Sequence, residues 1–439
     1  MKIPQSPPDL RKLVVSDPNL LEKISRALSA ETGDRYLHWD QLRFRTPPNG
    51  LTHEEWWAAV KLKRNLKTIP LRDKRGQEFR FLVPEAVAKQ LHLIDMGAGG
   101  RIGIESRVLN RDRRDRYVVS SLIREAITSS QLEGAVTTRE VAKNMLRSGR
   151  QPRDRSERMI LNNFMTMRAI SELREERLTP ELIFDIHRRV TKETLEKPDA
   201  AGRFRRADEG VLVEDAYGQV FHSPPDANEL GARMEAMCAF ANADEPFIHP
   251  VIRAILLHFW VGYDHPFVDG NGRTARAIFY WAMLHAGYWL FEFVSISDIL
   301  LKAPAQYYRA FLYSETDDND ATYFLIHQAE VIRRAVQSLH EYIDQKTKEM
   351  EESQHLLRAQ SHLNHRQLAL LSHAMRHPGH FYTVNSHRMS HNTAYDTARR
   401  DLLGLEEEGL LTKSKRGRAM VFLASPSLLS NLKKILGHP

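Results

Sequence analysis

Cysteine is almost absent from this 439-residue sequence, and the single Cys238 excludes a disulfide within one chain. Its context, MEAMCAF, is typical of a helix, which favours a buried thiol without a chemical role. No apolar run approaches the roughly 20 residues that a membrane-spanning helix needs. The N-terminus, MKIPQSPPDLRKLVV, also lacks the apolar core and cleavage site of a secretory signal. We therefore expect a cytoplasmic protein that makes no membrane contact.

Metal-binding signatures are missing as well. The 20 histidines form neither an HExxH motif nor the paired spacing that is typical of zinc sites. The acidic run Asp317–Asp320 lacks EF-hand spacing, so we interpret it as a helix-capping loop. The formal net charge of +7 is small for this length and allows an acidic partner without indicating one. Composition alone therefore assigns no function.

Length and residue pattern indicate three parts. Residues 1–108 combine helical pieces with a β-hairpin whose turn lies near Gly76. Residues 109–345 are dominated by helical periodicity. Residues 360–424 follow a long charged helix and show the order helix, helix, helix, hairpin, which is typical of a winged helix-turn-helix. The expected fold class is mainly α, with a β-hairpin inside the helical core and a mixed N-terminal segment.

The most informative stretch is residues 265–276, which read HPFVDGNGRTAR. Apolar helical runs flank it, so the GNG turn is expected in a loop that opens a helix. Free backbone N–H groups and the positive end of the helix dipole favour an anion at such a turn. The same segment carries a potential base, a carboxylate and two arginines. A polyphosphate fits this combination, and we expect the segment to bind a nucleotide.

This stretch resembles the signature of the Fic family, HPFx[D/E]GNGRxxR, and matches it at every fixed position. His249-Pro250 begins the preceding helix, as is common in that family, and residues 201–225 resemble its flap hairpin. The resemblance covers roughly residues 110–345. It implies a mostly helical core that uses ATP as co-substrate. It also implies transfer of AMP to a Ser, Thr or Tyr hydroxyl of a target protein or of the chain itself.

The chemistry of such a transfer assigns a role to each residue of the signature. The attacking hydroxyl must lose its proton, and His265 is the predicted general base because imidazole titrates near the working pH. Asp269 is predicted to hold Mg²⁺ that bridges two phosphates, since this cation prefers oxygen ligands. The glycines let the backbone approach the phosphates, the Asn271 amide adds a donor, and the arginines compensate the charge. The predicted phosphate-binding residues are Gly270, Asn271, Gly272, Arg273 and Arg276.

Residues 129–134, SSQLEG, resemble the inhibitory motif of the same family, [S/T]xxxE[G/N]. They match it at Ser129, Glu133 and Gly134, on a helix that precedes the core. The resemblance implies that Glu133 pairs with Arg276 and lets ATP bind only in an unproductive pose. A plainer alternative makes Glu133 a solvated residue at a helix end, before a glycine C-cap.

Two surfaces are candidates for larger partners. The hairpin edge at Val211, Leu212 and Val213 can add a strand of a target protein, although the same alternation also suits core packing. The C-terminal helix-turn-helix can bind DNA, with a protein-docking or homodimer module as the alternative. The residues predicted to contact DNA are Thr393, Tyr395, Arg399, Arg400, Lys413, Lys415, Arg416 and Arg418.

Alternatives to the adenylyltransferase remain open. The core could transfer another phosphate-containing group or remove AMP; relatives that phosphorylate their target carry lysine at the position of Gly272, which argues against phosphate transfer. The chain could instead be a DNA-binding transcriptional regulator whose core senses a nucleotide. The intact His265 argues against that hypothesis, since a sensor needs no base. The sequence does not indicate the target, the oligomeric state or the signal that relieves inhibition.

Overall fold

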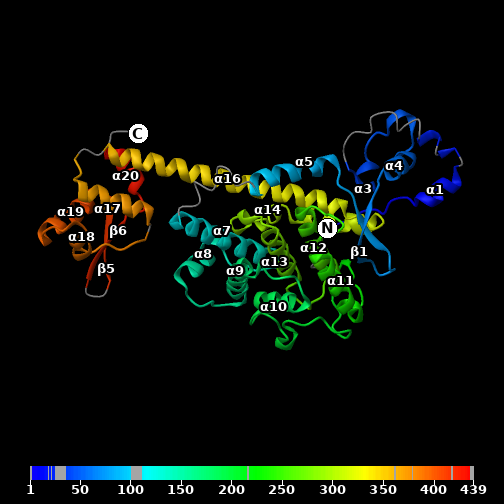
Figure 1. Ribbon diagram of the computed structural model, residues 1–439, viewed down its shortest axis with the longest axis horizontal. Coiled ribbons are helices and arrows are strands. Elements are labelled where there is room, and N and C mark those ends of the chain that lie inside the picture. The colour runs from blue at the N-terminus through cyan, green and yellow to red at the C-terminus, as the bar shows by residue number, and fades with distance from the viewer. Residues whose placement is uncertain are drawn as a thin grey trace. The chain divides into compact units, whose positions relative to one another are not determined.

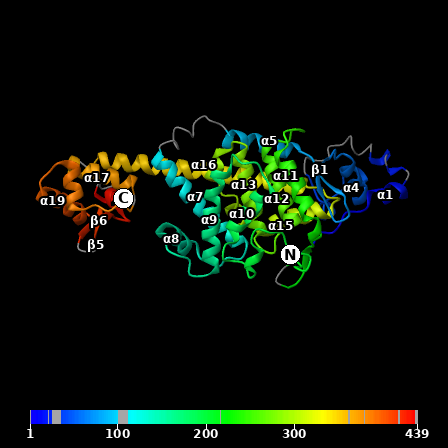
Figure 2. The same ribbon diagram turned by 60° about the horizontal axis from the view of Figure 1, so that its bottom comes forward.

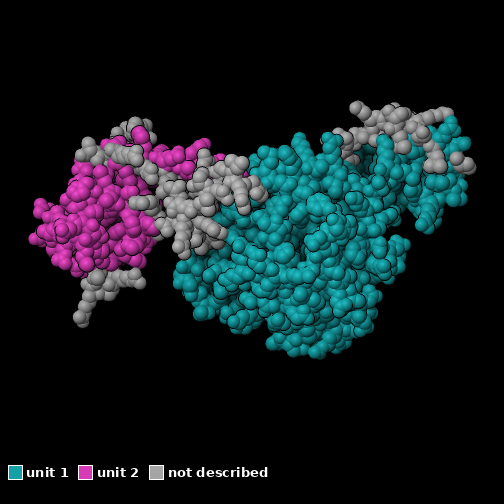
Figure 3. Space-filling view, in the orientation of Figure 1, with its two compact units in different colours: residues 1–339 teal, residues 340–439 magenta. Residues whose placement is uncertain are grey.

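The computed structural model is mainly helical, with small β-hairpins, as the sequence predicts. It divides into two compact units, residues 1–339 and 340–439, shown in different colours in Figure 3. Within the described ranges, no helix combines the length and apolar content that crossing a membrane requires. The structure describes residues 2–17, 19–20, 22–24, 36–99, 111–214, 217–359, 362–377, 379–416 and 419–435. The predicted boundary near residue 108 lies outside these ranges, and the three-part division stays a prediction.

The N-terminal part of the first unit carries short helices and one hairpin. The hairpin turns at Gly76, whose φ is 76°, in agreement with the sequence. Phe79 of this hairpin packs edge-on against Phe259 and Tyr263, with ring centroids 5.3 and 4.7 Å away. The elements are α1 (Leu10–Ser16), α3 (Trp39–Leu42), η1 (Pro48–Gly50), α4 (His53–Leu62), β1 (Lys67–Arg72), β2 (Glu78–Phe81), α5 (Glu85–Ile94) and η2 (Asp95–Gly99).

A buried ion network fastens α4 to the acidic run 317–320. Arg64 donates to Asp317 at 2.7 Å and to Asp320 at 3.1 Å, and Lys61 pairs with Asp317 as well. Both carboxylates are fully buried, so they depend on these cations. Asp320 also accepts the N–H of Thr322 at the start of α16, as expected of a capping loop.

The remainder of the first unit is a helical assembly centred on α12 and α13 (Figures 1 and 2). These two helices are apolar on nearly all sides, and most of their side chains are buried. The loop that joins them is therefore held by the most buried helices of the unit. The helices are α7 (Arg111–Leu132), α8 (Arg139–Ser148), α9 (Arg155–Leu173), α10 (Pro180–Thr191), α11 (Leu230–Asn242), α12 (Pro250–Asp264), α13 (Asn271–His285), α14 (Ser297–Leu300), α15 (Pro304–Thr316) and α16 (Thr322–Arg358).

The predicted flap is present as a short hairpin. Its strands are β3 (Val213–Glu214) and β4 (Val220–His222), and Val213 lies opposite His222. Val211 and Leu212 precede the observed strand, so the hairpin is shorter than the sequence suggests.

The second unit has the predicted order of three helices and a hairpin. These are α17 (His365–Arg376), α18 (Val384–His391), α19 (Tyr395–Glu407), β5 (Leu411–Arg416) and β6 (Ala419–Ala424). A further helix that the sequence analysis did not predict, α20 (Leu428–Ile435), adds Leu428 and Leu432 to the apolar core. Asp401 of α19 binds Arg366 at 2.7 Å and His387 at 3.2 Å, which ties α17, α18 and α19 together.

Candidate active site

The signature loop begins where α12 ends. His265 caps that helix in the left-handed region, with φ 45° and ψ 57°, and its N–H donates to the Val261 carbonyl at 3.0 Å. Nδ1 of the ring lies 3.4 Å from the Gly262 carbonyl oxygen. Because a carbonyl only accepts, this contact assigns the proton to Nδ1 and leaves Nε2 as the acceptor.

Electrostatics keep the His265 ring neutral. Burial, followed by the nearby His222, lowers the pKa of His265 to about 4. A neutral imidazole at pH 7 can take up a proton at Nε2. The predicted base therefore has the protonation state that its role requires.

Residues inside and outside the signature fix the shape of the loop. Asn271 accepts the Phe267 N–H at 2.9 Å and donates to the Phe267 carbonyl at 2.8 Å. The Phe267 ring is fully buried and stacks on His187, with centroids 3.7 Å apart. His187 donates from Nε2 to the Asp269 carbonyl and accepts the Gly202 N–H at Nδ1, both at 2.9 Å. The Asn271 side chain thus holds the loop, and its predicted role as an additional phosphate donor stays a prediction.

Arg205 connects the base of the flap to the same loop. Its guanidinium donates to the carbonyls of His265 at 2.9 Å and Pro225 at 2.5 Å. Its backbone N–H donates to the Pro266 carbonyl at 2.9 Å. His222, at the end of β4, contacts the Tyr263 carbonyl at 2.6 Å. The flap and the signature loop are therefore one hydrogen-bonded structure.

The N-terminus of α13 has the features of an anion-binding site. Gly270 forms its N-cap at φ 85°, and no side chain caps the helix. A Cβ on Gly270 would come within 2.6 Å of the Thr191 side chain, so only glycine fits this turn. The first backbone N–H groups of the helix are thus left for a ligand.

Two buried arginines follow at this helix end. Arg273 donates to the Val190 carbonyl at 2.9 Å, and its Nε has no partner. Arg276 donates from Nε to Ser129 Oγ at 2.8 Å and from Nη2 to the Ser129 carbonyl at 2.9 Å. Its Nη1 has no partner either. Buried N–H groups without partners are uncommon in folded proteins and indicate that a ligand completes the site.

The predicted contact between Glu133 and Arg276 is present. Oε1 of Glu133 lies 3.0 Å from Nη2 of Arg276. The same carboxylate lies against Gly272 so closely that a Cβ on this glycine would overlap it. Glu133 therefore extends from the end of α7 into the anion-binding end of α13, and Gly134 follows it at φ 87°.

Asp269 lies between two arginines. Its Oδ2 accepts from Arg155 at 3.0 Å, and its Oδ1 from Arg273 at 3.4 Å. Among the residues that the structure describes, no group of three or more His, Cys, Asp or Glu side chains could hold a metal ion by itself. Asp269 is thus the single carboxylate that the signature offers to a cation.

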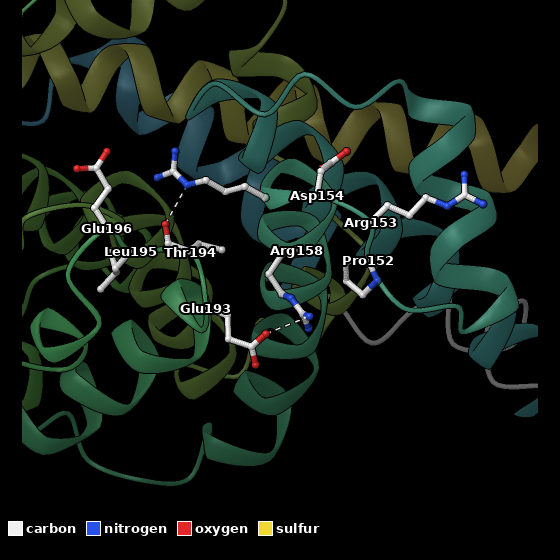
Figure 4. A pocket seen from close by; sticks show the side chains of 9 residues that line it. Pro152, Arg153, Asp154, Arg158, Glu193, Thr194, Leu195 and Glu196 are labelled. Atoms are coloured by element: carbon white, nitrogen blue, oxygen red, sulfur yellow. Dashed lines mark hydrogen bonds and ion pairs between the residues drawn. The ribbon is translucent and has the colours of Figure 1, made fainter.

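An open pocket of about 380 Å³ is lined in part by Arg155, the ion-pair partner of Asp269 (Figure 4). Arg155 connects Asp269 to this pocket, because its Nε also donates to the carbonyl of Thr194, which lines the pocket, at 2.9 Å. Arg158 pairs with Glu193 at 3.0 Å on the other side of the pocket. The lining residues are Pro152, Arg153, Asp154, Arg155, Arg158, Glu193, Thr194, Leu195 and Glu196.

The other candidate residues lie apart from this loop in the sequence. In the flap, Leu212 is half exposed, whereas Val211 and Val213 are partly buried. In the second unit, Tyr395, Arg399 and Arg400 are exposed on α19, and Thr393 is partly buried just before it. Lys413 and Lys415 are exposed on β5. Arg418 and the side chain of Arg416 lie outside the described part of the chain.

Comparison with known proteins agrees with this geometry. Residues 177–283 match the sequence model of the Fic/DOC family. The protein adenylyltransferase Fic of Nematostella vectensis is 36% identical over 116 residues, which is 26% of this chain and 25% of the relative. The protein of the same name from Drosophila grimshawi is 27% identical over 181 residues, 41% of this chain and 35% of the relative. The chain thus spans about a third or less of these relatives.

A solved structure supports the fold. The Fic family protein from Desulfovibrio desulfuricans G20 superposes with a TM-score of 0.54 at 20% identity, covering 79% of this chain and 97% of that one. The helical core, the signature loop and these matches define a Fic domain. The chain therefore contains a Fic domain, which the family model matches over residues 177–283.

Proposed function

We propose that the chain is a protein adenylyltransferase that moves AMP from ATP to a hydroxyl side chain of a protein or of itself. The observation that carries this proposal is the start of α13, where a glycine turn and two buried arginines with free N–H groups converge beside the neutral His265. Relatives that are named adenylyltransferases support it.

The proposed reaction uses the residues of the signature loop. Nε2 of His265 takes the proton of the attacking hydroxyl, whose oxygen forms a bond to the α-phosphorus of ATP. The bond from that phosphorus to the bridging oxygen breaks, and pyrophosphate leaves. The α13 N-terminus, Arg273 and Arg276 stabilise the charge on the phosphates. The products are an AMP–protein ester and pyrophosphate.

The donor set at Asp269 fits a divalent cation. Mg²⁺ commonly binds to one or two carboxylates together with substrate phosphates, and Asp269 supplies one carboxylate beside the anion-binding helix end. The bound cation would neutralise part of the phosphate charge. Arg155 occupies Oδ2 at 3.0 Å, so the carboxylate has to exchange this partner when a cation binds.

We further propose that Glu133 keeps basal activity low. Its carboxylate occupies the helix end that the phosphates need and takes one N–H of Arg276. Ser129 positions the same guanidinium through two more hydrogen bonds. ATP that binds while Glu133 stays in place would lack part of its charge compensation, and its α-phosphorus would be displaced from the attacking hydroxyl.

The flap is the proposed docking edge for the modified segment. Its exposed strand can pair with an extended peptide by backbone hydrogen bonds. Arg205 donates to carbonyls at the base of the flap and in the signature loop, and so fixes the flap relative to His265. A peptide paired with the flap would therefore have a fixed position relative to His265. A core that acted only as a nucleotide sensor would not need this arrangement.

Intact-mass spectrometry tests both proposals. The full-length chain, Glu133→Gly and Glu133→Gly/His265→Ala are incubated with ATP and Mg²⁺. We expect a mass gain of one adenylyl group that is largest in Glu133→Gly and absent in the double variant. An equal gain in wild type and Glu133→Gly would contradict inhibition by Glu133. No gain in any variant, with or without added candidate targets, would contradict the transferase and favour the nucleotide-sensing regulator.

A further inference from the structure

Exposed basic side chains without partners lie on three elements of the second unit, α18, α19 and β5, of which α19 packs against both others. Arg388 of α18, Arg399 and Arg400 of α19, and Lys413 and Lys415 of β5 are all exposed. Within the described residues, none of the five forms a hydrogen bond or an ion pair through its side chain. Unpaired cations on neighbouring elements repel each other, and an anionic partner removes that repulsion.

Two other basic residues of the same unit do form ion pairs. Arg366 pairs with Asp401 at 2.7 Å, and Lys433 pairs with Glu352 at 2.7 Å. Residues 362–435 contain eleven lysines and arginines against five aspartates and glutamates. Two of the acids are Asp401, which is buried in its network, and Asp396 in the first turn of α19. The excess positive charge therefore remains largely uncompensated.

The backbone presents these cations on a rigid frame. α18 and α19 are joined by the three residues 392–394, with Asn392 in the left-handed region at φ 46°. The N-cap of α19, Ala394, offers no side-chain hydrogen bond, so the first N–H groups of this helix are free for an anion. The Asp401 network holds α19 against α17 and α18.

The hairpin adds a second row of charge. Lys413 and Lys415 lie two residues apart on β5 and therefore on the same face of the strand. Tyr382 pairs with Phe422 by two backbone hydrogen bonds of 2.8 Å, which fastens the hairpin to the segment before α18. Helix and hairpin thus form one unit with two basic rows.

We propose that this unit binds duplex DNA, with α19 in the major groove and β5 along a flanking phosphate backbone. A helix of 13 residues is about 20 Å long, and the major groove admits a helix of this kind. Arg399, Arg400, Lys413 and Lys415 contact phosphates, and the exposed Tyr395 faces base edges. Asp396 on the same turn accepts from the amino group of a cytosine. This function is separate from AMP transfer.

Fluorescence anisotropy of a labelled random-sequence 30-base-pair duplex, titrated with the full-length chain from 50 to 300 mM NaCl, tests the proposal. We expect binding that weakens steeply with salt. Arg399→Ala/Arg400→Ala should reduce affinity at 50 mM NaCl at least about tenfold and lower the slope of log K against log salt by about 2. Lys413→Ala/Lys415→Ala should act similarly.

The matched control removes the same charge from α20. Lys433→Ala/Lys434→Ala should leave both the affinity and the salt slope within about twofold of wild type. The proposal is overturned if the duplex does not bind at 50 mM NaCl, which would favour a protein-docking role for this surface. It is also overturned if both helix and control variants weaken binding equally, or if a single strand of the same length binds as tightly as the duplex. The substituted side chains of α19 and β5 and that of Lys434 are exposed, and Lys433 is partly exposed in an ion pair with Glu352, so circular dichroism should show a folded chain for every variant.

Discussion

Oε1 of Glu133 accepts a hydrogen bond from Nη2 of Arg276 at 3.0 Å, although 143 positions separate the two residues in the chain. Arg276 is almost fully buried, with 2% of its side chain exposed, and Glu133 retains 24%. The pair links the end of α7 to the anion-binding end of α13. Because Gly272 lies directly beneath the Glu133 carboxylate, these three residues form one coupled group.

Gly272→Ala should therefore depend on Glu133. Alone, the added Cβ displaces the carboxylate, which is the far end of a flexible side chain, and breaks the pair, so we expect the free energy of unfolding to fall by about 1 kcal/mol. In the Glu133→Gly background the overlap is gone, and alanine is the better helix former, so Gly272→Ala should be neutral or slightly stabilising. A double-mutant cycle from chemical denaturation measures the difference. Additive effects would show that the two residues are not coupled.

The pH dependence of transfer should reflect the His265 ring. Burial lowers the pKa of His265 to about 4, so the imidazole is neutral and able to accept a proton at all pH values well above that. For Glu133→Gly, kcat/KM should be nearly constant from pH 8 to 6 and fall only toward pH 4. A profile that is already half-reduced near pH 6.5, the ordinary histidine value, would contradict this assignment.

Folding must be followed at each pH in that experiment. Burial also lowers the pKa values of His38 and His187 to about 4 and that of His258 to about 3. The unfolded chain therefore binds more protons than the folded chain from about pH 6.5 downward to these values. Stability should decrease as the pH falls through this window, and circular dichroism distinguishes this loss from a change in the base.

Arg155 should compete with a divalent cation for Asp269. Both side chains are substantially exposed, at 58% and 38%, so the ion pair is weak and its removal has a modest effect. In Arg155→Gln the Mg²⁺ concentration for half-maximal binding in the presence of ATP, measured by calorimetry, should fall about two- to fivefold. The control is Arg158→Gln, which loses its ion pair with Glu193 in the same pocket. It should leave the Mg²⁺ concentration for half-maximal binding unchanged.

Arg64→Leu should destabilise the first unit strongly. The change leaves Asp317 and Asp320 buried with fewer positive partners, which typically costs about 3–5 kcal/mol. Arg72→Leu removes an exposed pair with Glu78 and should cost less than about 1 kcal/mol. Denaturant titration monitored by tryptophan fluorescence compares the two variants. Similar losses would mean that the buried network contributes no more than a surface pair.

The sequence was most informative where residues follow a fixed spacing. The signature loop and the helix that follows it were predicted because short-range order defines the motif. The contact between Glu133 and Arg276 was predicted because residues 129–134 resemble the inhibitory motif of the Fic family. The hairpin order of residues 360–424 was also predicted from alternating and helical patterns. The structure agrees with these predictions at the level of elements and contacts.

The residues that support the signature loop follow no fixed spacing in the sequence, so they were not predicted. His187, Arg205 and His222 are single polar residues in otherwise ordinary segments, and their importance comes from long-range packing. The contribution of Asn271 to the shape of the loop was not predicted for the same reason: its two bonds to Phe267 depend on the path of the loop. α20 was missed because it follows a hairpin that looked like the end of a domain.

The two hydrogen bonds between the Asn271 side chain and the Phe267 backbone make position 271 informative about the function of the α13 N-terminus. Aspartate has nearly the shape of asparagine, and its charge would interact favourably with the positive end of the α13 dipole. It cannot donate to the Phe267 carbonyl, however, and it would bring its own negative charge to the place where the proposed phosphates bind. The neutral amide adds no charge of its own to this helix end, so the Glu133 carboxylate and the proposed phosphates compete for it without a fixed anion at position 271.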